Sequence, residues 1–291
     1  MSGQDAKADP VLRVRNLNVT IPTHDGELPA VRGVDITVER GRTLGIVGES
    51  GSGKSITSLA IMRLLNSRIR VEADEMRLAG LDLSGLGERE MADVRGDRLS
   101  MIFQEPMTAL NPVLTVGRQL RETYLRHRSA SRREAEERAV SLLERVGIPQ
   151  AADRLRVYPH QLSGGLRQRV MIAMALMCEP EMIIADEPTT ALDVTVQAQI
   201  LELLADLQKE RGLAMIFISH DIGVVSHIAH EVQVMHGGRT VERGEVNELL
   251  SHPTHPYTRA LLSAVPRRGM RWGRDTLGAV TWDENGEGAE S

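Results

Sequence analysis

The sequence predicts an α/β domain with a mainly parallel sheet. Short apolar segments typical of buried strands alternate with segments of helical period, as in parallel sheets covered by helices. The apolar segment at 43–47 runs into glycines and indicates a buried strand that enters a turn. A polar stretch at 114–157, rich in Arg and Glu and helical in period, interrupts the alternation and indicates an inserted helical subdomain.

The individual elements follow from the period of the apolar residues. We expect half-buried strands at 11–22 and 34–39, and buried strands at 43–47, 98–103, 181–185, 213–218 and 231–235. We expect helices at 54–65, 165–178, 194–210 and 221–229. The predicted organisation is a flexible N-terminus at 1–10, a domain at 11–266 whose helical subdomain spans about 106–164, and a loosely ordered tail at 267–291.

The composition excludes several classes of protein. The longest apolar run is 170–178, whereas a bilayer crossing needs about 20 residues, so we expect no membrane span. A net charge of −5 and an aromatic content of 2% argue against a nucleic-acid-binding protein. Cys178 is the single cysteine, which excludes a disulfide framework and a cysteine-bound metal cluster within one chain. The N-terminus lacks the apolar core of a secretory signal, so we expect the chain to stay in the cytoplasm.

Residues 48–55 read GESGSGKS and match the phosphate-loop pattern G-x-x-x-x-G-K-[ST] between a predicted strand and a predicted helix. Glycines let the backbone turn its N–H groups inward around an anion, and the following helix directs its positive end there. Lys54 can reach the β- and γ-phosphates, and the Ser55 hydroxyl can bind Mg²⁺. The predicted nucleotide-binding residues of this loop are Gly48, Glu49, Ser50, Gly51, Ser52, Gly53, Lys54, Ser55 and Ile56.

Two carboxylates, Asp186 and Glu187, follow the apolar segment 182–185. A strand beside the phosphate loop would direct Asp186 toward Mg²⁺ and leave Glu187 one step further, where it can polarise an attacking water. Together, the loop and the acid pair predict a nucleotide site with Mg²⁺ and a carboxylate that can activate water.

Four motifs in a fixed order make the resemblance specific. After the phosphate loop come Gln104 in IFQEP, LSGGLRQ at 162–168, ADEPTTALD at 185–193 and FISHD at 217–221. Over residues 11–266 the chain closely resembles the ATP-binding cassette (ABC) ATPases. Residues 104–112 and 255–262 resemble the oligopeptide, dipeptide and nickel importer branch of that family.

This resemblance implies a fold, a function and partners. The fold is a P-loop NTPase core with an N-terminal antiparallel β-subdomain and an inserted α-helical subdomain. The function is that of an ATP-hydrolysing subunit that powers uptake of peptides or related small solutes, with ATP and Mg²⁺ as cofactors. The implied partners are two permease subunits, a second ABC ATPase subunit (identical or paralogous) and an extracytoplasmic solute-binding protein, without nucleic acid. The implied location is the cytoplasmic face of the inner membrane.

The resemblance also assigns roles to residues. Gln104 completes the Mg²⁺ shell with Ser55 and Asp186, Glu187 is the general base, and His220 holds the γ-phosphate and the water. In a head-to-tail dimer, the helix N-terminus at Ser163, Gly164 and Gly165 faces the nucleotide of the partner, and Asp193 belongs to the loop that links the two sites. Ile21 stands where many relatives stack an aromatic ring on adenine, and residues 105–112 receive the permease.

Two alternatives remain open at this stage. One is a soluble ABC ATPase that acts on DNA or ribosomes; only residues 105–161 separate Gln104 from the signature, which leaves no room for the long coiled coil of DNA-repair relatives. The other is a mainly regulatory half of a heterodimer, which Leu166 and Ile21 leave open and which Glu187 and His220 oppose. Some relatives carry a cysteine-rich C-terminal segment, and its absence here predicts no iron–sulfur cluster.

Overall fold

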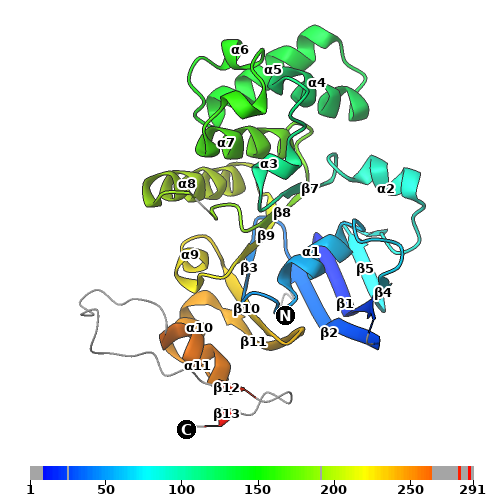
Figure 1. The fold of residues 1–291 in the computed structure, drawn as a ribbon, viewed down its shortest axis with the longest axis vertical. Helices are drawn as coiled ribbons and strands as arrows, with labels where there is room; N and C mark the ends of the chain where they lie inside the picture. Colours follow the sequence, from blue (N-terminus) through cyan, green and yellow to red (C-terminus); the bar gives the residue numbers. More distant parts are fainter. Residues whose placement is uncertain (1–8, 25, 191, 264–280, 283–287, 290–291) are drawn as a thin grey trace, which may run out of the picture. The chain divides into compact units, whose positions relative to one another are not determined.

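The computed structural model describes residues 9–24, 26–190, 192–263, 281–282 and 288–289 (Figure 1). The chain forms two compact units, each assembled from separate stretches of sequence. The first unit holds residues 1–13, 37–42 and 75–216, and the second holds 14–36, 43–74 and 217–291. The chain passes from the first unit to the second within strand β9 (Ala214–Ser219).

The first unit contains a pair of buried parallel strands with helices inserted between them in sequence. β7 (Leu99–Ile102) and β8 (Met182–Asp186) pair in parallel, and all their residues are buried. The other elements of this unit are β5 (Glu75–Leu78), β6 (Leu81–Asp82), α2 (Glu88–Val94), α3 (Pro106–Ala109), α4 (Val116–His127), α5 (Arg132–Arg145), α6 (Ala151–Arg154), a 3₁₀ helix (Pro159–Gln161), α7 (Gly164–Ala175) and α8 (Val194–Arg211).

The inserted helices form a small core of their own. α4, α5 and α7 contact one another and bury Leu120, Ala139 and Leu143. α5 begins where the Ser131 hydroxyl accepts from the Glu134 N–H at 3.2 Å, while the Glu134 carboxylate accepts from the Ser131 N–H at 2.6 Å. This reciprocal capping box satisfies donors that the first turn of a helix leaves unpaired. The inserted helical subdomain predicted by the sequence is therefore present.

The second unit contains both antiparallel and parallel strand pairs. β10 (Glu231–His236) pairs in parallel with β3 (Thr43–Val47) and antiparallel with β11 (Arg239–Glu245). β4 (Arg70–Glu72) lies antiparallel to β1 (Leu12–Thr23). The remaining elements are β2 (Gly26–Val38), α1 (Lys54–Ile61), α9 (Ile222–Ser226), α10 (Val246–Ser251), α11 (Pro256–Ser263), β12 (Thr281–Trp282) and β13 (Gly288–Ala289).

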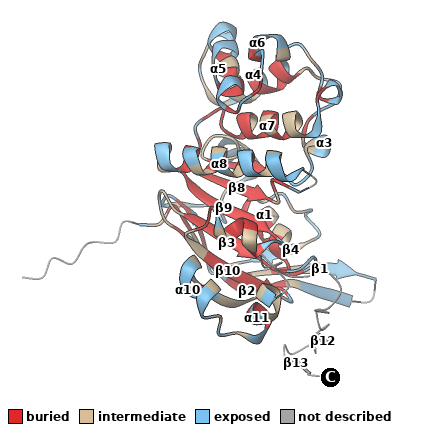
Figure 2. Ribbon diagram, turned by 90° about the vertical axis from the view of Figure 1, so that its left-hand side faces the viewer, coloured by how far each residue is buried: buried red, intermediate tan, exposed pale blue. Residues whose placement is uncertain are grey.

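Each unit has its own neighbouring strands. In the second unit β2 and β4 both lie beside β1, and β10 lies between β11 and β3; in the first unit β5 lies beside β6 and β7 beside β8. Figure 2 shows β3, β8, β9 and β10 buried, whereas α8 and α10 expose much of their surface. The predicted fold class, with a mainly parallel core sheet and an N-terminal antiparallel sheet, is confirmed. Among the described helices, none has the length and apolar character that a bilayer crossing requires.

The structure departs from several of the predicted elements. The strand expected at 34–39 already begins at Gly26, and the helix expected at 54–65 ends at Ile61, just before Arg63 adopts a left-handed φ of 52°. Within the tail expected to be loosely ordered, β12 and β13 pair antiparallel. The rest of that tail, and residues 1–8 of the predicted flexible N-terminus, lie outside the described residues.

Candidate nucleotide site

The phosphate loop joins β3 to α1 in the second unit, as its sequence predicts. Lys54, the first residue of α1, is 5% exposed and turns back over the loop. Its ammonium group donates to the carbonyl oxygens of Gly48 at 2.6 Å and Glu49 at 2.8 Å. The Lys54 ammonium group therefore lies at the N-terminus of α1, where its positive charge and the helix dipole both favour an anion.

Two glycines of the loop are required by close packing. A Cβ on Gly48 would lie 2.2 Å from the carbonyl oxygen of Met235. Gly53 has a φ of 98°, and a Cβ there would lie 2.7 Å from the carbonyl oxygen of Ala30. Gly53 is also the N-cap of α1 and offers no side chain to its amides. The positive end of the helix dipole therefore points to the loop, where it favours an anion.

The acid pair lies at the end of β8 in the first unit. Asp186 is 5% exposed, and the half-buried Glu187 has a φ of 46°, in the left-handed region that non-glycine residues rarely adopt. Such backbone costs about 1–3 kcal/mol and persists where surrounding contacts impose it, often at functional sites. The Glu187 carboxylate accepts from Gln104 Nε2 at 3.2 Å and from the Thr190 hydroxyl at 2.8 Å.

The structure thus brings Gln104 and Glu187 together in the first unit. Thr190 lies in the predicted ADEPTTALD motif, but sequence reasoning assigned it no role. A hydroxyl three residues after Glu187 was the available signal.

The signature and the aspartate after it both lie at helix N-termini in the first unit. Ser163 is the N-cap of α7, and its hydroxyl accepts from the Leu166 N–H at 3.4 Å. Ser163 and Gly164 are exposed, and Gly165 is half-buried. Asp193 caps α8 by accepting from the Val196 N–H at 3.0 Å. Exposed amides and a hydroxyl at the start of a twelve-residue helix form a surface suited to phosphate.

The remaining predicted residues lie in the second unit. His220 is exposed directly after β9, and Asp221 beyond it caps α9 by accepting from the Gly223 N–H at 2.7 Å. Ile21 lies half-buried in β1. The phosphate loop, His220 and Ile21 therefore belong to one unit, whereas Gln104, Asp186, Glu187 and the signature belong to the other.

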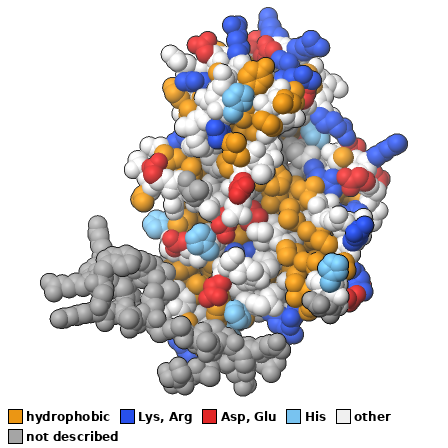
Figure 3. All heavy atoms as spheres, in the orientation of Figure 1, with side chains coloured by type: hydrophobic (Ala, Val, Ile, Leu, Met, Phe, Trp, Pro, Cys, Tyr) orange, Lys and Arg blue, Asp and Glu red, His pale blue; other side chains and the backbone are white. Residues whose placement is uncertain are grey.

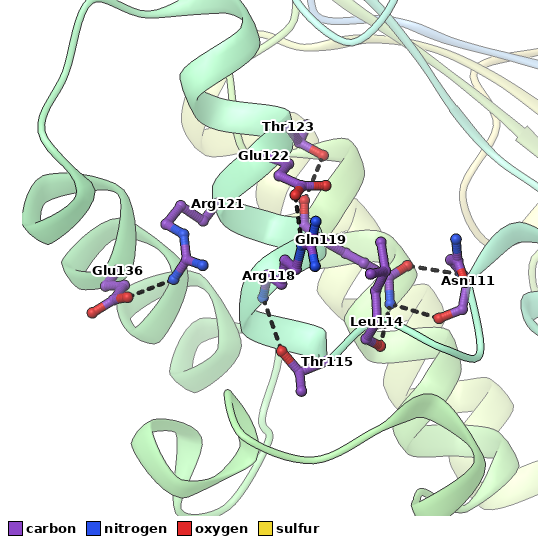
Figure 4. Close-up of polar contacts among 9 residues, drawn as sticks. All are labelled: Asn111, Leu114, Thr115, Arg118, Gln119, Arg121, Glu122, Thr123 and Glu136. Carbon is purple, nitrogen blue, oxygen red and sulfur yellow. Dashed lines mark hydrogen bonds and ion pairs between the residues drawn. The ribbon is translucent and has the colours of Figure 1, made fainter.

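The side chain of Gln119 stabilises the exposed loop that follows Gln104, at residues 105–114, through hydrogen bonds to its backbone. Gln119, in α4, is 8% exposed and makes hydrogen bonds to the backbone at Asn111 and Leu114 (Figure 4). Met107 is 54% exposed in α3, and Val113 is 75% exposed. The loop therefore exposes apolar side chains, and its backbone conformation is fixed by the hydrogen bonds from Gln119.

A separate pocket lies among the inserted helices and contains none of the predicted site residues. Its charges include the ion pair of Arg121 with Glu136 at 2.6 Å, drawn in Figure 4. Figure 3 shows Lys and Arg side chains gathered at the top of the view, over α4 to α6. The pocket is lined by Thr115, Gly117, Arg118, Arg121, Glu136, Ala152, Leu155 and Arg156.

Two family models match the chain. The ABC transporter model matches residues 31–190, and the model of the oligopeptide/dipeptide transporter C-terminal region matches residues 241–283. The chain therefore belongs to the ABC transporter family. Within this family it resembles the ATP-binding subunits of the oligopeptide and dipeptide branch, so it is an ATPase whose hydrolysis powers uptake through a membrane transporter.

Individual relatives agree with this placement. A putative peptide import ATP-binding protein of Brucella melitensis is 53% identical over 266 residues, covering 89% of this chain and 79% of the relative. The glutathione import ATP-binding protein GsiA of Escherichia coli K12 is 54% identical over 271 residues, covering 91% of this chain and 44% of the relative.

Solved structures show the same fold. A dimeric ATP-binding cassette in a post-hydrolysis state, bound to ADP and Pi, has a TM-score of 0.72 at 27% identity, covering 81% of this chain and 98% of that one. CbiO1 from Clostridium perfringens, part of the cbiONQ transporter complex, has a TM-score of 0.69 at 27% identity, covering 84% and 92%. The comparisons support ATP as the nucleotide, and they lend no support to an ATPase that acts on DNA or ribosomes or to a mainly regulatory half.

Proposed function

We propose that this ATPase drives the import of peptides or related small solutes from the cytoplasmic face of the inner membrane. Its partners are two permease subunits, a second ABC ATPase subunit and an extracytoplasmic solute-binding protein. The observation that supports the proposal is the buried Lys54 at the N-terminus of α1, where its charge and the helix dipole both favour an anion. The relatives of the chain include peptide and glutathione import proteins.

The proposed roles around the phosphates follow from the chemistry of the donors. The loop residues 48–56 surround the phosphates, where amide groups and the Lys54 ammonium offset the negative charge that develops during transfer. A hydroxyl, an amide oxygen and a carboxylate are the oxygen ligands that Mg²⁺ accepts, so Ser55, Gln104 and Asp186 fit this ion. Bound Mg²⁺ would neutralise phosphate charge.

We assign the attack on the γ-phosphate to a water that Glu187 deprotonates. The hydrogen bonds from Gln104 and Thr190 orient the Glu187 carboxylate. His220 then holds the γ-phosphate and the water, and Ile21 contacts adenine without stacking. A proton acceptor held in a fixed position contributes about 10²–10⁴-fold to such a step.

The second ABC subunit completes the site in this proposal. Ser163, Gly164 and Gly165 of one copy offer a hydroxyl and amides to the γ-phosphate bound by the other, and Asp193 lies in the loop that links the two sites. Closure around ATP and reopening after hydrolysis would then drive the permease through residues 105–112.

Purification of the full-length chain from detergent-solubilised membranes tests this function. We expect permease subunits and a second ABC subunit to co-purify. In vesicles, we expect the complex to take up peptide only when ATP is present on the side of the membrane where this chain lies. Isolation without permease subunits, or uptake of peptide that does not depend on ATP, would contradict the proposal.

A further inference from the structure

The C-terminal segment 252–263 touches the phosphate loop through one hydroxyl group. The backbone N–H of Glu49 donates to the phenolic oxygen of Tyr257 at 3.1 Å. Tyr257 belongs to α11 and is 1% exposed, whereas Glu49 is exposed, so the contact is partly buried. The two residues are 208 positions apart in the sequence. The contact therefore joins a segment matched by the oligopeptide/dipeptide C-terminal model to the nucleotide loop.

Several contacts fix the position of Tyr257. Its ring lies against the His236 imidazole at the end of β10, with the ring centres 4.2 Å apart. The Tyr257 N–H donates to His255 Nδ1 at 3.1 Å. Before α11, the Glu242 carboxylate in β11 accepts from the Thr254 N–H at 2.7 Å and the His255 N–H at 3.1 Å. The ring contact and the hydrogen bonds at residues 254–257 thus fix where the phenolic oxygen lies.

Hydrogen bonds consequently fix the backbone of the phosphate loop at two residues, Glu49 and Ser52. The Glu49 N–H is bound by Tyr257, while the Glu49 carbonyl accepts from Lys54 at 2.8 Å. Further along, the Ser52 carbonyl accepts from the Gly238 N–H at 3.1 Å. A loop that is already ordered loses less conformational entropy when it binds a ligand, and therefore binds more tightly.

The Tyr257 hydroxyl is uncharged, which is compatible with a position beside a loop that binds phosphate. Burial raises the pKa of Tyr257 above its ordinary value of 10.0, although the Glu49 amide opposes the shift. The phenol therefore stays neutral at physiological pH. A neutral group can hold an amide beside a triphosphate without repelling its negative charge.

We propose that Tyr257 is a positioning residue that pre-orders the phosphate loop for nucleotide through the Glu49 amide. The hydroxyl acts through the loop backbone, so its removal weakens nucleotide binding more than it changes the fold. This inference rests on the proposed function, in which residues 48–56 bind ATP.

The test compares the full-length chain with Tyr257→Phe, which removes only the hydroxyl. We expect ATP and ADP to bind about 3- to 10-fold more weakly by calorimetry, the range that loss of one hydrogen bond gives. Amide hydrogen exchange without nucleotide should quicken in peptides that contain Glu49 and stay unchanged in α5. Tyr124→Phe, in the half-buried part of α4, is the matched control and should leave both measurements at wild-type values.

Lys54→Ala separates this inference from the proposed function. If Lys54→Ala weakens ATP binding and Tyr257→Phe leaves affinity unchanged, the role of Tyr257 is refuted while the nucleotide site stands. If Lys54→Ala binds ATP as tightly as the wild type, the nucleotide site itself is wrong and the role of Tyr257 falls with it. Weaker binding together with faster exchange at Glu49 supports the inference.

Discussion

Gln119 binds the backbone of Asn111 in both directions. The Asn111 N–H donates to Gln119 Oε1 at 2.8 Å, and Gln119 Nε2 donates to the Asn111 carbonyl at 3.0 Å (Figure 4). The same Nε2 donates to the Leu114 carbonyl at 3.0 Å. One buried side chain of α4 thus fixes the shape of the exposed loop that we propose receives the permease.

Replacing Gln119 with Leu is expected to uncouple uptake from hydrolysis. Leu has a similar size but leaves the backbone groups of the loop without their partner, and we expect the free energy of unfolding to fall by about 1–3 kcal/mol. In vesicles that contain the complete transporter, uptake per ATP hydrolysed should fall several-fold. Arg118→Gln is the control, because an exposed ion pair such as Arg118 with Glu122 contributes only about 0.2–1 kcal/mol. Unchanged uptake per ATP in Gln119→Leu would argue against the proposed permease surface.

Replacing Glu187 with Gln is expected to separate binding from turnover. The amide keeps the shape of the side chain, and its oxygen can still accept from Thr190, but it cannot take a proton from water. We expect the Kd for ATP to stay within about twofold and kcat to fall by about 10²–10⁴-fold. Steady-state phosphate release and calorimetry measure the two quantities. Glu202→Gln, on the exposed surface of α8, controls for the lost charge, and a wild-type rate in Glu187→Gln would assign the base elsewhere.

Replacing Lys54 with Ala is expected to weaken nucleotide binding directly. The change removes a positive charge from the anion site and also the hydrogen bonds to the Gly48 and Glu49 carbonyls. Because a hydrogen bond that involves a charged group is worth about 1.5–3 kcal/mol, we expect the Kd for ATP to rise by about 10- to 100-fold. Lys209→Ala, on the exposed end of α8, removes an equal charge and should leave the Kd unchanged.

Replacing Glu242 with Gln is expected to lower the free energy of unfolding at neutral pH. It should also make that free energy less dependent on pH in the acidic range. Burial raises the pKa of Glu242, but hydrogen bonds from residues 254–258 outweigh it and lower the pKa below the usual 4.5. The carboxylate therefore stabilises the fold fully above the unfolded pKa, and this stabilisation is lost as the pH falls through the lower folded pKa. Urea unfolding at pH 7 and below pH 4 should show a gap of about 1–3 kcal/mol between wild type and variant at pH 7 that narrows in acid.

The exposed Glu248 in α10 provides the control for this pH dependence. Glu248→Gln should unfold as the wild type does at both pH values. An equal gap for Glu242→Gln at pH 7 and below pH 4 would show that the carboxylate charge does not stabilise the C-terminal segment.

Much of the site could be predicted because it is encoded over short stretches. The strand, glycine turn and helix of the phosphate loop follow one another in the sequence, so local pattern alone identifies them. The same holds for the acid pair after β8 and for the helix that begins at Ser163. The short strands β4, β5 and β6 were missed, because segments of two to four residues carry no measurable period. β11 was missed because its residues are charged or partly exposed.

The sequence by itself determined the family, the order of the motifs and the chemical groups that can bind a phosphate. Tertiary structure alone decided that Gln104 lies against Glu187, that Glu187 adopts a left-handed backbone and that Tyr257 reaches the Glu49 amide. The reason is that local propensity acts over a few residues, whereas these contacts join positions 83 and 208 residues apart. Only the packing of strands and helices brings such positions within hydrogen-bond distance.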